Sequence, residues 1–351
     1  MKKNLIVLLV TAVALMSFTS DKPAYILYNQ DGKEVKYAKM LKELEGADII
    51  FFGELHTDPI AHWMQLELTK ALYSQKKDAL ILGAEMFEAD NQLIMDEYLG
   101  GLYPTKKYEA EIRLWDNYQT DYKPVVEFAK ENGIPFIATN IPRRYASMVH
   151  VGGFEALDKL SDEALSYIAP LPIAYDPEVK CYKDMLDMGK MGAPTGKKAP
   201  EGMKEAPKGM KEAPAGMKEA PKGMKETPAG MKEAPAGMKE APKGMPAAHG
   251  MDMPKINMEN LPKAQAAKDA TMAHFIMENW TAGKVMFHFN GSYHSNNYQG
   301  IMWHLQKENK DLKIVSINTV LQEEIDTLAD ENLNTANYII CVPESMTRTK
   351  R

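Results

Sequence analysis

Short apolar runs alternate with amphipathic segments along this chain, and this alternation limits its possible folds more than any other feature. The strand-like runs are residues 48–53, 79–84, 135–139, 284–290, 312–317 and 337–342. Helical patterns lie between them, such as the segment that opens with Asp58 as N-cap and Pro59 in its first turn. The pattern predicts an α/β fold, with a mostly parallel sheet and helices on both faces.

Several boundaries of these elements are also readable. Helices are expected at residues 90–99 and 124–131, the second closed by Asn132-Gly133, a C-cap signal. The last strand is expected at a sheet edge, because Pro343 ends it.

A seven-residue repeat of Gly-Met-Lys-Glu-Ala-Pro interrupts the pattern between residues 192 and 260. Seven residues is also the coiled-coil period, but every complete unit holds a proline, which costs about 3 kcal/mol inside a helix. Pro-rich polar segments in which Lys and Glu cancel stay extended and solvated. We therefore predict a long disordered insert at 192–260 within one discontinuous domain, made of residues 21–191 and 261–351.

The repeat places a methionine in each unit, and His249, Met251 and Met253 follow it. Thioether sulfur suits Cu(I), so one interpretation is a copper-binding segment. The other is that a repeat expanded and carried its methionines along.

Residues 1–20 are typical of a secretory signal peptide. Lys2 and Lys3 precede an apolar stretch at 5–16 that is too short to span a membrane, and small residues then offer a cleavage site. The alternative is a retained N-terminal anchor. No cysteine lies near the cleavage region, so a lipid anchor is not expected. The sequence thus predicts an exported protein, periplasmic or associated with the cell envelope.

Composition excludes two classes of protein. Cys181 and Cys341 are the only cysteines, so the chain is not a disulfide scaffold. A net charge of −6 at pH 7 lacks the basic bias of nucleic-acid binders.

Polar residues follow four of the predicted strands, where ligands bind in open α/β sheets. Buried polar groups at such positions need partners, because unpaired burial costs several kcal/mol. Two carboxylates and two histidines that converge there could hold a divalent metal or act as general acid and base. The residues at these strand ends are Glu54, His56, Glu85, Asn140, Arg143 and His294, the last just after Gly291.

Other histidines fit ordinary structural roles. His62, His274 and His304 are expected to be lone helix histidines, His62 on a surface or edge, and His150 marks a helix end. Asp269 is either a capping or ion-pairing residue or a residue that points into the site.

Five motifs occur in an order that resembles the ChaN-like haem-binding uptake proteins, within the wider group of Tiki proteases, TraB and erythromycin esterases. The motifs are Gly53-Glu54-Leu55-His56, Glu85-Met86-Phe87-Glu88, Asn140-Ile141-Pro142-Arg143, residues 268–273 and Gly291-Ser292-Tyr293-His294 with Gly300-Ile301. Two features depart from the family pattern: no cysteine follows the signal, and the methionine repeat is extra.

The resemblance implies haem binding and iron acquisition at the cell envelope, with tyrosine ligation and two molecules paired around haem. The expected function is therefore an exported haem-binding protein for haem or iron uptake, with a homodimer and an outer-membrane haem receptor as possible partners. Related proteins are metal-dependent hydrolases or peptidases, which is the alternative function.

The resemblance also implies roles for single residues. Glu54, His56, Glu85 and His294 match the shared motifs and would be catalytic or bind a divalent metal. Residues expected to bind haem are Asn140, Arg143, Asp269, Tyr122 and Tyr293. Candidates for the iron-ligating tyrosine are Tyr98, Tyr118, Tyr122, Tyr145 and Tyr293.

Overall fold

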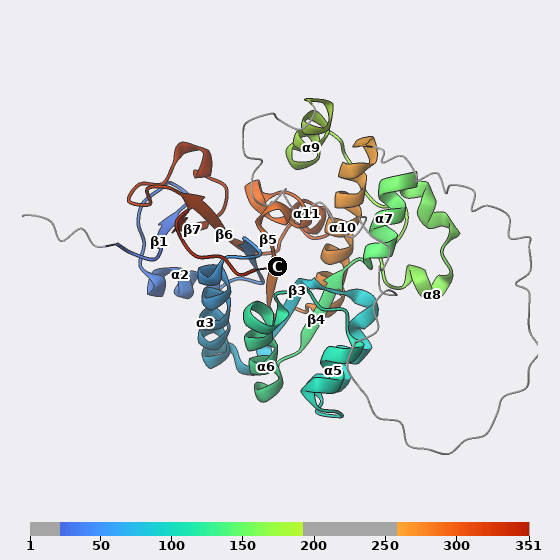
Figure 1. Cartoon of the computed structure of the whole chain (residues 1–351), viewed down its shortest axis with the longest axis horizontal. Helices are drawn as coiled ribbons and strands as arrows, with labels where there is room; N and C mark the ends of the chain where they lie inside the picture. The colour runs from blue at the N-terminus through green and yellow to red at the C-terminus, as the bar shows by residue number, and fades with distance from the viewer. Residues whose placement is uncertain (1–21, 192–257, 351) are drawn as a thin grey trace, which may run out of the picture.

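A seven-stranded sheet forms the centre of the protein, seen in a computed structural model that describes residues 22–191 and 258–350 (Figure 1). Its strand order is β1-β7-β6-β2-β5-β3-β4, and all pairings are parallel except that of β1 with β7. The strands are β1 (Ile26–Asn29), β2 (Ile49–Glu54), β3 (Leu80–Glu88), β4 (Phe136–Asn140), β5 (Val285–Gly291), β6 (Ile314–Gln322) and β7 (Tyr338–Pro343).

The six predicted strands are confirmed, but the predicted sheet edge is wrong. β7 lies between β6 and β1 and is therefore an interior strand. Pro343 is its last residue, so the proline ends the strand without interrupting the pairing of the residues before it. The edge strand on this side of the sheet is β1, which the sequence did not predict because Ile26–Asn29 is only four residues long.

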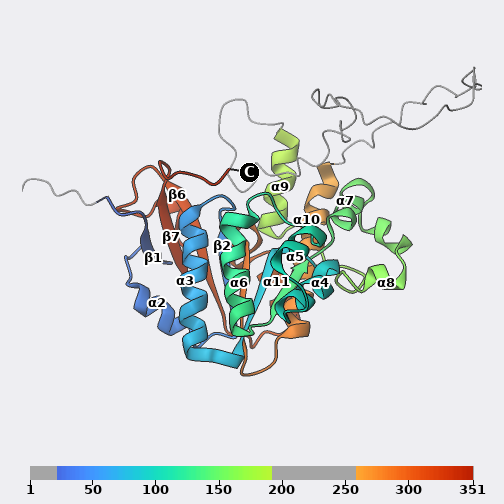
Figure 2. The same ribbon diagram turned by 60° about the horizontal axis from the view of Figure 1, so that its bottom comes forward.

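Helices cover both faces of the sheet, as predicted. They are α2 (Tyr37–Leu44), α3 (Pro59–Lys76), α4 (Gln92–Leu99), α5 (Thr105–Glu111), α6 (Lys123–Asn132), α7 (Arg143–Gly152), α8 (Asp162–Leu165), α9 (Lys180–Met191), α10 (Leu261–Asn279) and α11 (Ile301–Glu308). Figure 2 shows α3 and α6 in front of the strands, and Figure 1 shows α7 and α8 to one side of the sheet.

Side chains of β2 alternate between two cores, as the two-residue period of a strand requires. Ile50 and Phe52 pack in the core that includes α3 and α6. Ile49 and Phe51 pack in the core that includes α10 and α11. A strand buried on both faces explains why residues 48–53 read as a continuous apolar run.

The predicted helix boundaries are confirmed where they can be compared. Asp58 caps α3 by accepting a hydrogen bond from the Ala61 amide at 2.9 Å. Gly133 ends α6 with a φ of 65°, in the left-handed region that favours glycine.

The signal peptide and the methionine repeat lie outside the described residues. The described chain resumes at Met258, where the 3-10 turn η7 (Met258–Asn260) leads into α10. Within the described ranges, no helix combines the length and the apolar character needed to cross a membrane.

Candidate functional site

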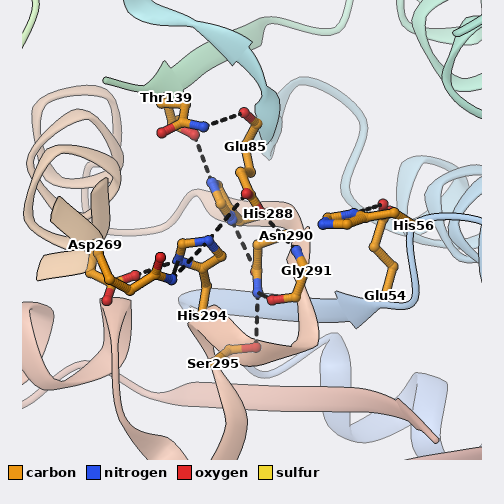
Figure 3. Close-up of polar contacts among 12 residues, drawn as sticks. Glu54, His56, Glu85, Thr139, Asp269, His288, Asn290, Gly291, His294 and Ser295 are labelled. Atoms are coloured by element: carbon orange, nitrogen blue, oxygen red, sulfur yellow. Dashed lines mark hydrogen bonds and ion pairs between the residues drawn. The ribbon is translucent and has the colours of Figure 1, made fainter. Parts of the chain in front are cut away.

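Two polar clusters meet at the carboxyl ends of three neighbouring strands, β2, β5 and β3 (Figure 3). The Glu54 cluster comprises Glu54, His56, His62, Gln65 and Tyr122. The His294 cluster comprises Glu85, Gln265, Asp269 and His294.

Glu54 is the centre of the first cluster and is almost completely buried. Its Oε1 accepts hydrogen bonds from His56 Nδ1 at 2.8 Å and the Tyr122 hydroxyl at 2.7 Å. Its Oε2 accepts from Gln65 Nε2 at 2.5 Å and lies 3.6 Å from His62 Nδ1. Burial opposes ionisation, but His62, His56 and Tyr122 outweigh it and lower the pKa of Glu54 to about 2.

His56 is held in one orientation from three sides. Glu54 engages Nδ1, the Trp115 ring meets the imidazole edge-on at 4.9 Å, and Asn117 Nδ2 donates to the His56 carbonyl at 2.8 Å. The side chain is 14% exposed. Since Nδ1 is bound, Nε2 is the ring nitrogen that faces the tip of β5.

His294 is the centre of the second cluster, between two carboxylates. Its Nδ1 lies 2.5 Å from Asp269 Oδ1 and its Nε2 lies 3.1 Å from Glu85 Oε1. Gln265 Nε2 lies 3.0 Å from Nδ1. Burial disfavours the imidazolium, yet Glu85 and Asp269 together raise the pKa of His294 to about 9, so this histidine is a cation at neutral pH.

Gly291 joins the two clusters. Its amide donates to Glu85 Oε2 at 2.7 Å. A Cβ at this position would lie 2.8 Å from the His56 ring and 3.4 Å from Glu85 Oε2, so both side chains reach the space that a larger residue would fill. The structure therefore brings Glu54, His56, Glu85 and His294 together at one edge of the sheet.

Gly291→Ala tests this close approach. A Cβ contact of 2.8 Å forces the His56 ring away from the tip of β5. We expect a loss of about 1–3 kcal/mol in the free energy of unfolding, typical of overpacking. Urea denaturation measures this loss. The control is Gly46→Ala, because a Cβ at that position would have no contact closer than 3.5 Å. Gly101→Ala is a poor control because the φ of Gly101 is positive. A Gly291→Ala variant as stable as Gly46→Ala would contradict the geometry.

A third group of polar side chains supports the tip of β5. His288 Nε2 lies 2.7 Å from Thr139 Oγ1, and its Nδ1 lies 3.2 Å from Asn290 Oδ1. Asn290 Nδ2 donates to the Gly291 carbonyl at 2.9 Å and to Ser295 Oγ at 3.0 Å. Burial lowers the pKa of His288 to about 4, so it is neutral and acts as a fixed hydrogen-bonding group.

The remaining predicted residues have protein partners at the same edge of the sheet. Asn140 Nδ2 donates to the Glu85 carbonyl at 2.9 Å, and Arg143 Nε donates to Glu88 at 2.6 Å. The two roles left open for Asp269 coincide, because it forms an ion pair with His294 within the site. Tyr293 donates to the Cys181 carbonyl at 2.8 Å, and burial raises its pKa.

Two histidines were predicted wrongly. His62 is buried in the Glu54 cluster, and its Nε2 lies 3.1 Å from the His56 carbonyl and 3.4 Å from Asp121. His304 is also buried, 3.3 Å from the Tyr182 hydroxyl, which donates to Asp269 at 2.9 Å. A lone histidine on a helix carries no sequence signal for such contacts, because the partners come from distant elements.

The C-terminal segment also reaches the site. The Thr349 amide donates to the Thr57 carbonyl at 2.9 Å, and its hydroxyl donates to Asp121 at 3.0 Å. Arg348 lies 3.4 Å from Asp58. The last residues of the described chain thus hold the loop that carries His56, a role the sequence did not indicate.

The predicted metal centre finds no support in this arrangement. The carboxylate oxygens of Glu54 and Glu85 already accept hydrogen bonds from protein groups, and both nitrogens of His294 face carboxylates. Across residues 22–191 and 258–350, no group of three or more His, Cys, Asp or Glu side chains is arranged to hold a metal ion. The same geometry suits proton exchange: His56 presents one free ring nitrogen, and His294 holds a proton.

A model of the family described as haem-binding uptake, Tiki superfamily, ChaN, matches residues 40–305, which include both clusters. The chain belongs to the ChaN family. Comparison with curated proteins gives no match.

Among solved structures, this ChaN family member resembles ChaN of Campylobacter jejuni, whose structure was solved for cofacial haem binding. The TM-score is 0.57 at 17% identity, over 90% of this chain and 96% of that one, which shows a shared fold. A Bacillus cereus protein aligns with a TM-score of 0.41 at 12% identity over 87% of this chain and 90% of that one, and adds nothing to that conclusion.

Proposed function

We propose that this ChaN family protein is an exported haem-binding protein that takes part in haem or iron uptake at the cell envelope. The observation that carries the proposal is the family match over residues 40–305. The gathering of the family motifs at one edge of the sheet supports it, because this edge is where α/β folds bind ligands. The signal-like residues 1–20 support export.

We further propose Tyr145 as the iron ligand, because the other candidate tyrosines fit tyrosinate ligation poorly. Burial, followed by Glu127, raises the pKa of Tyr98 to about 12. Burial also raises the pKa of Tyr118 and Tyr293, and the Tyr122 hydroxyl is bound to Glu54. Tyrosinate is an anion, so a phenol beside a cation is the better ligand for ferric haem.

Tyr145 meets that requirement. Its hydroxyl lies 3.1 Å from Arg144 Nη2, and the Arg144 guanidinium lies over its ring at 4.3 Å. It is in the first turn of α7, directly after β4 at the carboxyl edge of the sheet.

Hemin titration followed by absorbance tests the proposed ligand. We expect a saturable Soret change with a tyrosinate-type spectrum, lost or strongly altered in Tyr145→Phe. Tyr122→Phe and Tyr293→Phe are matched controls, because each removes one buried hydroxyl and should keep the spectrum. Saturable binding with an unchanged spectrum in Tyr145→Phe would reject Tyr145 while leaving haem binding in place.

The proposed partners are a second copy of the chain around haem and an outer-membrane haem receptor. Sedimentation with and without hemin tests the first. A hemin-dependent dimer is expected, and a monomer at saturating hemin would contradict it.

A further inference from the structure

After β7 the chain returns to the site as a strap, which we define as residues 344–350. The strap begins at the end of β6, where the Glu344 amide donates to the Gln322 carbonyl at 2.9 Å. Met346 then packs against the core that includes α3 and α6. In the sheet order β7-β6-β2 the strap crosses two strands before it meets the loop after β2. Figure 1 shows this part of the chain running from β7 toward the centre of the molecule.

Two contacts attach the strap to the loop after β2, which carries His56. The Thr349 amide donates to the Thr57 carbonyl at 2.9 Å, and Arg348 Nη1 lies 3.4 Å from Asp58 Oδ2. The Asp58 side chain is completely buried and caps α3 through its other oxygen. Burial raises the pKa of Asp58, and the charge of Arg348 offsets part of this effect. The strap thus stabilises the start of the helix that carries two members of the Glu54 cluster.

Asp121 links the strap to the backbone of His56. This carboxylate is 5% exposed, and its Oδ1 accepts a hydrogen bond from the Thr349 hydroxyl at 3.0 Å. Its Oδ2 accepts from Asn117 Nδ2 at 2.6 Å and lies 3.4 Å from His62 Nε2. Asn117 and His62 also lie 2.8 and 3.1 Å from the His56 carbonyl. One buried acid therefore connects the strap to both groups that hold His56 in place.

The strap itself is held more weakly than the core beneath it. It lies outside every helix and strand of the described chain, and four of its seven residues are exposed. Met346 is only partly buried, and the Arg348 side chain is 21% exposed. Segments with few buried apolar contacts open at a lower free energy than core strands. The strap can therefore detach while the sheet stays folded, and the loop after β2 then loses three of its supports.

We propose that the strap controls access to His56, as a positioning segment that holds the loop after β2 closed and whose release opens the Glu54 cluster to a ligand. The His56 side chain is 14% exposed with the strap in place, so most of its ring is out of reach while the loop is held. This inference goes beyond the proposed haem binding and does not depend on it, since it concerns the movement of the loop whatever the ligand.

Modification of the full-length protein by diethylpyrocarbonate, located by mass spectrometry, measures how often the His56 ring becomes accessible. Arg348→Ala removes the cation of the strap, and Thr349→Val removes its hydroxyl donor. We expect His56 to react at least about tenfold faster in Arg348→Ala, because a contact between charged groups contributes about that factor to the closed state. Thr349→Val should act in the same direction. Arg348→Lys should restore part of the protection, since the charge remains.

Lys350→Gln is the matched control, because it removes an exposed charge from the same segment and should leave the His56 rate unchanged. His288, which is completely buried on β5, reports opening of the whole fold and should stay slow in every variant. An unchanged His56 rate in both Arg348→Ala and Thr349→Val would overturn the proposal. Equal acceleration of His56 and His288 would also overturn it, because the strap would then stabilise the whole protein. Neither result depends on whether hemin binds.

Discussion

His294→Ala should lower the free energy of unfolding by about 3–5 kcal/mol, the usual effect of removing one partner of a buried ion pair. Glu85 and Asp269 both face this imidazolium, at 3.1 and 2.5 Å. Both carboxylates are almost completely buried, so water cannot replace the cation when it is removed. Without His294 two carboxylates remain buried close together, and their mutual repulsion adds to the cost of desolvation.

Urea denaturation at neutral pH measures the effect, with His274→Ala as control. His274 lies on α10, the helix that carries Asp269, but it is partly exposed and packs against the neighbouring Phe275 ring. We expect a change within about 0.5 kcal/mol for the control. Adding Asp269→Asn to His294→Ala should recover part of the loss, because one uncompensated charge disappears. A loss for His294→Ala no larger than the control's would mean that His294 is not the shared cation.

The stability of the protein is expected to peak near pH 6.5 and to fall on both sides. His294 has a pKa raised to about 9 from 6.5, so its contribution is complete below pH 6.5 and is lost as the pH rises through about 9. The loss is on the order of 3 kcal/mol. His288 has a pKa lowered to about 4, so the unfolded chain gains protons first and stability also falls as the pH drops from 6.5 toward 4.

Two variants separate these limbs. Asp269→Asn removes one of the carboxylates that hold the proton on His294, so the alkaline fall should become smaller and end at a lower pH. His288→Gln removes one of two buried imidazoles whose pKa burial lowers to about 4, the other being His304, and should make the acid fall shallower. Chemical denaturation at a series of pH values gives both curves. An alkaline limb identical in the wild type and Asp269→Asn would contradict the assignment to His294.

Much of the fold was predictable, because each buried strand is a short apolar run and the helices are amphipathic segments between these runs. What failed depended on long-range pairing. The order of strands, the antiparallel β1 and the interior place of β7 follow from how separated segments pair, which no local pattern records.

The site was predictable to the extent that strand ends expose its members. Glu54, His56, Glu85 and His294 each follow an apolar run, and parallel strands bring such ends together. His62, Gln65 and Tyr182 were missed because they lie on helices and enter the site only through packing. The pairing of Arg113 with Glu88 was missed for a similar reason, since the two residues meet across 25 residues of chain.

Crystals soaked with hemin and measured at the iron absorption edge would locate the bound metal directly. The account predicts an iron peak at the carboxyl edge of the sheet, next to Tyr145. An iron peak on the opposite edge, or crystals that take up no hemin, would contradict it.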